Sequence, residues 1–592
     1  TTNFNVSIYN TLQHSGIGGD NATDGGLTKR GNGMLTLADN YYSSYTGPTF
    51  VAGGTLSLYP NSIINLNSLM VSNAALNLNI TGGAATFNAA SVKFNGNNTL
   101  NLNYDVMAST PPTTLNVSGG LTVAGTTTIN IFGYGWTAGQ QIALVDYSGT
   151  PLANLSNFVL GALPYGVTAN LSNNVANTSI DLVITAVSLT SWIPLLGTDP
   201  VGISSFNSSG LWQDGSAPSA GKGYLTRTFA VRSPADSNPY TFGGSALSVD
   251  VGGRFIMKGT GGQVMTVDNL ILNGGLVDYA NSGDNLTETL GGNITLQAGL
   301  TSYIGALGSG GASETLYVTA TIGGSGNLQI SGSPASNAGS DLGVVVLAAT
   351  NSYTGNTTVA TGTLLVNGHN GSSPITVNAN ATLGGNGLVG STVNLLAGST
   401  LAPGTPTRGA LTAALGTLTA NGTAAVSGAV VMKLNRDAIT NSDQFGAAAI
   451  TINPGATLTV NNLSTTPLAG GDTFTLFSGP VSGSFSTVTL PTLASTNLYW
   501  TNNLAVNGSI SVVAPVTVNT SSTNVMATIS GNTLTLAWPS DHKGWHLQVQ
   551  TNGLSGGLGT NWITIPGSDT VTSTNIQINP ANGSVFFRMV YP

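Results

Sequence analysis

Apolar and polar residues alternate along most of the chain in short runs of four to eight residues. Residues 55–58 (TLSL) and 456–460 (ATLTV) are typical. The runs end in Gly, Asn or Pro-Gly, which favour turns. Alternation with a period of two and many β-branched residues predicts short strands. No stretch repeats its apolar residues with the helical period of 3.6, so the pattern predicts an all-β protein.

The composition supports this prediction. Only 6% of the 592 residues are charged, 80 are Gly, and Glu288 and Glu314 are the only glutamates. Amphipathic helices need charged side chains on their solvent-facing side, so a mainly helical fold is excluded. Disorder driven by charge is excluded as well, because 41% of the residues are hydrophobic. The exposed positions of the predicted strands must be filled by Thr, Ser, Asn and Gly.

Charge and cysteine content exclude several classes of partner and chemistry. The formal net charge is −8 and the 13 basic residues are scattered, whereas nucleic-acid binding needs a clustered basic surface. The absence of Cys excludes disulfides, thiolate catalysis and Cys-ligated zinc. The most apolar stretch, residues 182–197, is interrupted by Pro194 and is too short to span a bilayer. We therefore expect no nucleic-acid partner and no membrane-spanning segment.

Two segments of the chain repeat with similar sequences. Residues 33–56 contain GMLTLADN, SYTG and GTL, and residues 343–364 contain GVVVLAATN, SYTG and GTL. A second pair lies downstream of each: residues 138–149 resemble residues 469–479. Repetition of this kind is typical of stacked architectures. It predicts two related modules, at residues 1–189 and 190–515.

The repeated segments resemble a known family. The autotransporter-associated β-strand repeat of bacterial passenger domains is similar to residues 25–56 and 352–364. The strings ATLGG and GSTLAPG after residue 380 also resemble the coils that follow such repeats. The resemblance implies a right-handed parallel β-helix that is secreted and located outside the cell or on the bacterial surface. Such passengers are followed by a translocator barrel, and we find no matching strand pattern in this sequence.

Residues 516–592 form a third predicted domain. Ten apolar residues are its core candidates: Leu534, Leu536, Trp538, Trp545, Leu547, Val549, Trp562, Ile563, Phe586 and Phe587. The segment resembles the small C-terminal β-sandwich of many secreted bacterial repeat proteins. That resemblance implies an export or attachment tag, or a capping module.

Acidic residues were considered as a glycosidase pair, because some parallel β-helix proteins degrade polysaccharides and need two carboxylates. The candidates are Asp278, Asp284 and Glu288, with Asp236, Asp250 and Asp268 upstream. Asp is common in turns, where it binds its own backbone. We therefore interpret these acids as turn residues and predict no catalytic residue.

Three further motifs also have simpler explanations. Residues 553–557 (GLSGG) match the G-x-S-x-G string, but that motif must be followed by a helix. His542 and His546 could share a metal on a helix, whereas on a strand they lie roughly 13 Å apart. Residues 20–25 (DNATDG) lack ligand positions of a calcium loop. We predict no metal and no cofactor.

The N-terminal strand is the candidate for contact with another molecule. Phe4, Val6 and Ile8 alternate with polar residues and form one apolar face. An unpaired end strand tends to add to other sheets. We consider two arrangements: the strand docks on the C-terminal domain of a neighbouring copy, or it forms the first coil of its own module.

These observations predict a secreted structural or surface protein that forms fibres or filaments or mediates adhesion, with self-association as its main interaction and no enzymatic activity. The alternative is a carbohydrate-binding or polysaccharide-degrading β-helix that recognises surface glycans. In that case Trp136, Trp192, Trp212, Tyr41 and Tyr42 would stack on sugars, although such aromatics are often core or cap residues. Because few carboxylates are present, we expect little loss of stability between about pH 4 and 9.

Overall fold

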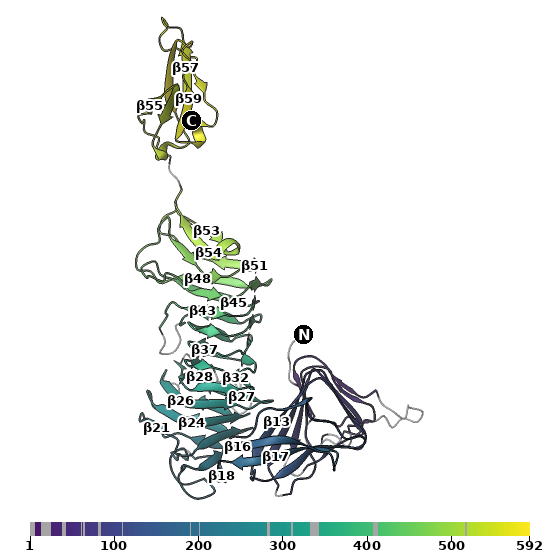
Figure 1. The fold of residues 1–592 in the computed structure, drawn as a ribbon. Helices are drawn as coiled ribbons and strands as arrows, with labels where there is room; N and C mark the ends of the chain where they lie inside the picture. Colours follow the sequence, from purple (N-terminus) through teal and green to yellow (C-terminus); the bar gives the residue numbers. More distant parts are fainter. Residues whose placement is uncertain are drawn as a thin grey trace. The chain divides into compact units, whose positions relative to one another are not determined.

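A computed structural model describes most of the chain (Figure 1). The described residues are 6–13, 25–37, 43–60, 62, 66–80, 85–108, 110–189, 191–200, 202–280, 285–309, 312–331, 342–406, 412–515 and 518–591. The chain divides into two compact units. The first contains residues 1–466, 474–491 and 502–510, and the second contains residues 467–473, 492–501 and 511–592.

The strands that precede residue 190 form a parallel β-helix, called here the first β-helix. Its longest sheet has the order β1 (Val6–Ile8), β3 (Met34–Leu37), β5 (Thr55–Leu58), β7 (Ala75–Ile80), β10 (Asn98–Val106), β13 (Thr127–Tyr134) and β15 (Phe158–Leu160). A second sheet contains β12 (Leu121–Ala124), β9 (Ser91–Asn95), β6 (Ser68–Ser72), β4 (Thr49–Val51) and β2 (Leu27–Lys29). The third has the order β16 (Val167–Asn174), β17 (Ser179–Val187), β14 (Gln141–Tyr147), β11 (Leu115–Val117) and β8 (Phe87–Ala89).

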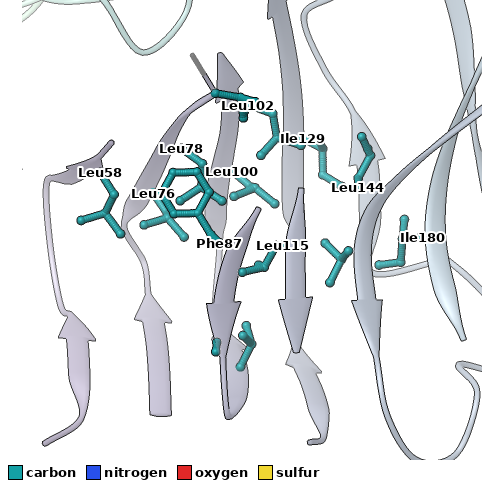
Figure 2. Packing of buried hydrophobic residues seen from close by; sticks show 14 of the residues in the cluster. Leu58, Leu76, Leu78, Phe87, Leu100, Leu102, Leu115, Ile129, Leu144 and Ile180 are labelled. Atoms are coloured by element: carbon teal, nitrogen blue, oxygen red, sulfur yellow. The ribbon is translucent and has the colours of Figure 1, made fainter. Parts of the chain in front are cut away.

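Aliphatic side chains fill the interior of the first β-helix in register from coil to coil. Leu100 of β10 lies between Leu76 of β7 and Ile129 of β13, and these three side chains are fully buried. Figure 2 shows this row together with Leu78 and Leu102 on the neighbouring positions. The two-residue alternation in the sequence therefore corresponds to inward and outward positions on stacked strands.

The second β-helix follows the same plan. Its longest sheet has the order β18 (Ser191–Pro194), β19 (Lys222–Leu225), β22 (Ala246–Asp250), β24 (Val264–Asn273), β26 (Thr287–Leu296), β30 (Thr315–Val318), β33 (Val344–Leu347), β36 (Thr363–Val366), β39 (Thr382–Gly385), β42 (Thr400–Pro403), β45 (Ala429–Leu434), β48 (Thr457–Asn462) and β52 (Thr487–Thr489), with β21 (Tyr240–Thr241) and β31 (Thr321–Gly324) alongside.

Two further sheets complete the coils of the second β-helix. One has the order β20 (Ala230–Arg232), β23 (Arg254–Met257), β25 (Leu276–Tyr279), β27 (Thr301–Ala306), β32 (Asn327–Ile330), β35 (Thr357–Val359), β38 (Ile375–Val377), β41 (Val393–Leu395), β44 (Ala424–Val426), β47 (Ile450–Ile452) and β51 (Val481–Gly483). The other has the order β34 (Thr350–Asn351), β37 (His369–Asn370), β40 (Leu388–Val389), β43 (Thr417–Ala420), β46 (Gln444–Gly446) and β50 (Phe477–Ser478). β28 (Gly308–Ser309) and β29 (Ala312–Ser313) form a short hairpin.

The stacking of the second β-helix is visible in one continuous row of inward side chains. Each member of the row is paired with the next and has no exposed surface: Leu316, Val345, Leu364, Leu383, Leu401, Val430 and Leu458. Parallel pairing leaves every coil hydrogen-bonded to both neighbours. The predicted parallel β-helix is confirmed.

Antiparallel strands occupy the remainder of the chain. β49 (Thr473–Thr475), β54 (Ser509–Val513) and β53 (Tyr499–Asn503) form one small sheet, and the four-residue helix α1 (Leu504–Asn507) lies between the last two in sequence. The C-terminal sandwich has two sheets: β55 (Met526–Ser530), β56 (Thr533–Ala537) and β59 (Ser573–Gln577); and β58 (Ile563–Thr564), β57 (His546–Asn552) and β60 (Ser584–Val590). Two 3₁₀ turns, η2 (Ser540–His542) and η3 (Ser568–Thr570), connect its strands.

The core of the sandwich contains most of the predicted residues. Leu536, Trp538 and Leu547 are buried between the sheets, and Leu534 and Phe587 pack against them. The predicted C-terminal β-sandwich is thus confirmed. Ile563 was predicted in the core, but its side chain is 69% exposed. It lies in the two-residue edge strand β58, where the opposite sheet does not cover it.

Candidate functional site

The repeated SYTG segment forms the same buried turn in both β-helices. The hydroxyl of Tyr45 is 2.7 Å from Thr49 Oγ1, and the hydroxyl of Tyr353 is 2.8 Å from Thr357 Oγ1. Burial raises the pKa of both tyrosines above the usual value, so each hydroxyl stays neutral. The turn is a structural element of the repeat.

The GTL segment that follows also has the same conformation in both copies. Gly54 and Gly362 precede β5 and β36 with φ angles of 61° and 68°, in the left-handed region that glycine adopts at no steric cost. A Cβ on Gly54 would lie 2.3 Å from the carbonyl oxygen of Gly33 in the adjacent coil. These glycines therefore explain why the repeat ends in GTL.

The second pair of repeated segments makes the same two backbone hydrogen bonds in both copies. In the first, Gly139 N donates to Ile184 O at 2.8 Å and Ile184 N donates to Gln140 O at 2.9 Å. The same two bonds join Gly471 N to Val512 O and Val512 N to Asp472 O, both at 2.8 Å. β14 is covered by β17 in antiparallel pairing. The duplicated sequence thus encodes the same backbone contact with a later strand in both copies.

The first coil of the second β-helix is closed by aromatic side chains. Phe206 stacks on Phe255 with ring centroids 5.2 Å apart, and Trp212 contacts the edge of Tyr224 at 4.8 Å. The indole nitrogen of Trp212 donates to Ser205 O, and all four side chains are fully buried. These residues cover the end of the hydrophobic core.

Two of the five aromatic residues proposed as sugar platforms, Trp136 and Trp212, are core or cap residues. Trp136 is buried, donates to Gly133 O at 2.8 Å and contacts the edge of Tyr104. Trp212 belongs to the cap described above, and Trp192 is half-buried. Tyr41 and Tyr42 lie outside the described residues. Neither Trp136 nor Trp212 presents a ring face to solvent.

The first coil of the first β-helix ends differently. β1 pairs in parallel with β3, with Val6 opposite Leu35 and Ile8 opposite Leu37. Ile8 packs against the hydrophobic core, whereas Val6 is 51% and Tyr9 is 63% exposed. Within the described residues β3 is the only strand paired with β1. Phe4, the third residue of the predicted strand, lies outside the described residues.

The acids of the second β-helix are not turn residues, and our interpretation was wrong for four of them. Four of the six candidates lie in strands: Asp250 in β22, Asp268 in β24, Asp278 in β25 and Glu288 in β26. Asp236 is the only one of the six in a described loop, where it accepts a bond from Tyr240 at 2.8 Å. Asp284 lies outside the described residues.

Asp278 and Glu288 are held by different groups. Asp278 forms an ion pair with Arg254 at 2.5 Å. Glu288 is fully buried and accepts a bond from Gly261 N at 2.7 Å. Burial raises the pKa of the Glu288 carboxyl to about 7, partly offset by the backbone hydrogen bonds. Glu288 is thus a buried acid that titrates close to neutral pH.

A second buried charge pair was not predicted. Lys433 Nζ lies 2.7 Å from Asp443 Oδ2 and donates to Pro403 O at 2.7 Å. Gly416 N and Lys433 N also donate to the carboxylate at 2.9 and 2.8 Å. Both side chains are almost fully buried. A spacing of ten residues across a loop is no known motif, so the sequence offers no signal for this pair.

The remaining motifs have structural roles. Residues 553–557 form a loop between β57 and β58, so a strand follows where the hydrolase motif needs a helix. Both ring nitrogens of His542 are engaged, with Asp541 Oδ1 at 2.8 Å and Ser521 O at 2.7 Å. His542 lies in η2 rather than on the expected strand, and His546 begins β57. Asp20 and Asp24 lie outside the described residues.

The described part of the chain contains no group of three or more His, Cys, Asp or Glu side chains arranged to hold a metal ion. It also contains no helix long and apolar enough to cross a membrane.

The sequence profile of the passenger-associated-transport-repeat family matches this chain twice, at residues 27–58 and 340–366. These matches contain the two copies of the SYTG turn and the GTL segment. The chain thus carries two repeats of the autotransporter passenger type. The predicted resemblance is confirmed, and such repeats indicate a secreted, cell-surface location.

No curated protein matches this chain. The crystal structure of the Haemophilus influenzae Hap adhesin matches with 13% sequence identity and a TM-score of 0.22. The alignment covers 86% of this chain and 59% of the Hap chain.

Proposed function

We propose that this passenger-type protein is a structural or adhesive element of the cell surface, and that its copies join head to tail into fibres. The observation that carries the proposal is the contrast between coil ends. At the other end of the first β-helix β17 pairs with β14, and buried aromatic side chains occupy the first coil of the second, while β1 has β3 as its only described partner and leaves Val6 and Tyr9 exposed. A strand with a free edge supplies backbone donors and acceptors to another sheet.

The amino-acid composition supports assembly of copies into fibres rather than catalysis of a reaction. Outward side chains are mostly Thr, Ser, Asn and Gly, which allow close approach of two surfaces without charge repulsion. Asp278 and Glu288, the densest acids, are engaged with Arg254 and Gly261. In the carbohydrate-binding alternative Trp136 and Trp212 would stack on sugars, but both are buried. We therefore propose that the protein acts through shape and contact, without catalysis.

The proposal is tested by negative-stain microscopy and sedimentation over a concentration series. We expect filaments or large oligomers of the full chain, and their loss after deletion of residues 1–10. Val6→Lys is the milder variant, because this half-exposed position tolerates a charge without unfolding the coil. Circular dichroism checks the fold of each variant.

Two outcomes would overturn the proposal. A full chain that remains monomeric at every concentration argues against fibres, and unchanged filaments after the deletion argue against β1. Release of reducing sugar from a polysaccharide, or a bound oligosaccharide, would favour the carbohydrate alternative.

A further inference from the structure

The C-terminal sandwich has an unusually apolar surface for its size. Nine of the 23 large hydrophobic side chains that are exposed in the described chain belong to it: Met526, Ile529, Leu554, Leu558, Ile563, Val571, Ile578, Val585 and Tyr591. Between residues 516 and 592 its charges are Asp541, Lys543, Asp569 and Arg588, which cancel. An apolar surface without net charge favours association with another protein surface.

β55 is the most exposed strand of this sandwich. All five of its side chains are exposed, and it pairs with β56 along one edge only. Ile529 lies opposite Leu534, which packs into the core, yet Ile529 is 69% exposed. The core-facing side of β55 thus extends beyond the part of the sandwich that the opposite sheet covers.

Both β55 and β1 lack the features that usually prevent edge strands from pairing. Charged side chains and prolines serve this purpose in natural sheets, as Pro194 in β18 and Arg588 in β60 illustrate here. No charged residue occurs between Asp472 and Asp541, and none precedes Asp20. Neither strand contains Pro. Among the described residues, each of the two strands pairs along one edge only, and neither strand carries a charged side chain.

We propose that the free edge of β1 in one copy adds to the free edge of β55 in the C-terminal sandwich of the next copy. This proposal rests on the proposed function and names the acceptor strand. The donor and acceptor are different surfaces of the same chain, so the contact is heterologous and repeats from copy to copy. Main-chain hydrogen bonds provide the pairing, and Val6, Met526 and Ile529 add apolar contact.

The size of the contact determines how the assembly should behave. Three residues of β1 against five of β55 bury far less than the roughly 1,600 Å² of a standard interface. Each contact is therefore reversible, and filament length increases with protein concentration. Because neither edge carries charge, we expect salt to weaken the filaments little, and sulfate to strengthen the apolar contact.

A pair of isoleucines provides a matched test. Ile529 in β55 and Ile563 in β58 are both 69% exposed, so lysine at either position perturbs the fold equally little. We expect Ile529→Lys to raise the concentration needed for filaments by tenfold or more, and Ile563→Lys to leave it unchanged. Val6→Glu alone should also prevent assembly, whereas a mixture of Val6→Glu and Ile529→Lys should co-assemble by charge complementarity.

Cysteine trapping tests the contact directly, because the natural chain contains no Cys. Neighbouring strands bring facing Cα atoms within disulfide range. The Val6→Cys variant should form a reducible cross-linked dimer when it is mixed with Ile529→Cys. Separate mixtures with Ala527→Cys and Thr528→Cys allow for a different register of the two strands. Val6→Cys with Ile563→Cys should give none.

The outcomes separate this proposal from the proposed function. If the Ile529→Lys variant forms filaments as readily as the natural protein and no cross-linked dimer is trapped, β55 is not the acceptor, and the fibre proposal still holds. Absence of wild-type filaments would overturn both. If Ile563→Lys prevents filament formation and Ile529→Lys does not, the acceptor lies on β58 and the proposal is contradicted.

Discussion

The two β-helices stabilise their buried polar groups in different ways. In the first, neutral amides form a ladder: Asn101 donates to Asn77 at 2.6 Å and Asn130 donates to Asn101 at 2.8 Å, on the strand face opposite to the leucine rows. The second contains in addition a buried ion pair, between Lys433 and Asp443. An amide can donate to one neighbour and accept from the other, so the ladder extends over any number of coils. Charges of one sign cannot be stacked in this way.

The comparison predicts that the second β-helix is more sensitive to the loss of one side chain. Asp443→Ala leaves the Lys433 ammonium buried without its carboxylate, and removing one partner of a buried pair costs about 3–5 kcal/mol. Urea unfolding followed by circular dichroism should show an early transition in this variant. The double variant Lys433→Met, Asp443→Leu should be close to the natural protein, and a similar loss in the double variant would contradict this account.

Glu288 should give the second β-helix a pH dependence. Its pKa is raised by burial to about 7 in the folded state, above the value of about 4.3 in an unfolded chain. Between these values the folded state binds more protons, so stability decreases as pH rises from about 4.5 to 7. The loss should be about 2 kcal/mol, since one pKa unit corresponds to about 1.4 kcal/mol and solvent screens part of the shift.

Urea midpoints at several pH values measure this dependence. Glu288→Gln, which cannot ionise, should flatten the profile and be more stable than the natural protein at pH 8. The composition predicts a nearly flat profile between about pH 4 and 9, and Glu288 is the exception that the structure adds. An unchanged slope in Glu288→Gln would assign the pH dependence to another group.

In the first β-helix, Asn101→Ala removes two amide bonds and leaves Asn77 and Asn130 each with an unsatisfied buried atom. We expect a loss of about 1–2 kcal/mol in the free energy of unfolding. Asn116 makes a similar bond to Asn88 at 3.0 Å, but at an exposed position. Asn116→Ala should therefore cost less than about 0.5 kcal/mol, and equal losses in the two variants would show that burial of the ladder is irrelevant.

The smallest expected effect concerns the turn that the two β-helices share. Tyr45→Phe and Tyr353→Phe each remove one hydroxyl bond to Thr, which is worth about 1 kcal/mol. Thermal unfolding should show similar decreases for both variants. A large difference between them would mean that the repeated turn is not energetically equivalent in the two copies.

The sequence predicted the strands, the duplication and the sandwich because these depend on local patterns. The SYTG turn and the glycines before β5 and β36 are local signals, and both recur in the structure. Asp278 and Glu288 were misinterpreted because Asp in a Gly- and Asn-rich segment looks like a turn residue. Glu288 lies at an inward position, paired with the buried Leu316, and nothing in the local pattern distinguishes it from a turn residue. The spacing of Lys433 and Asp443 likewise does not reveal the packing that buries them.

The backbone contact that recurs in both copies has a consequence for how such chains can evolve. In each copy the repeated segment contributes Gly139 or Gly471, whereas the partner, Ile184 or Val512, lies outside that segment. A short duplication of the segment alone would leave these backbone groups without their partner strand. Chains of this kind therefore lengthen most readily by long units that contain both strands.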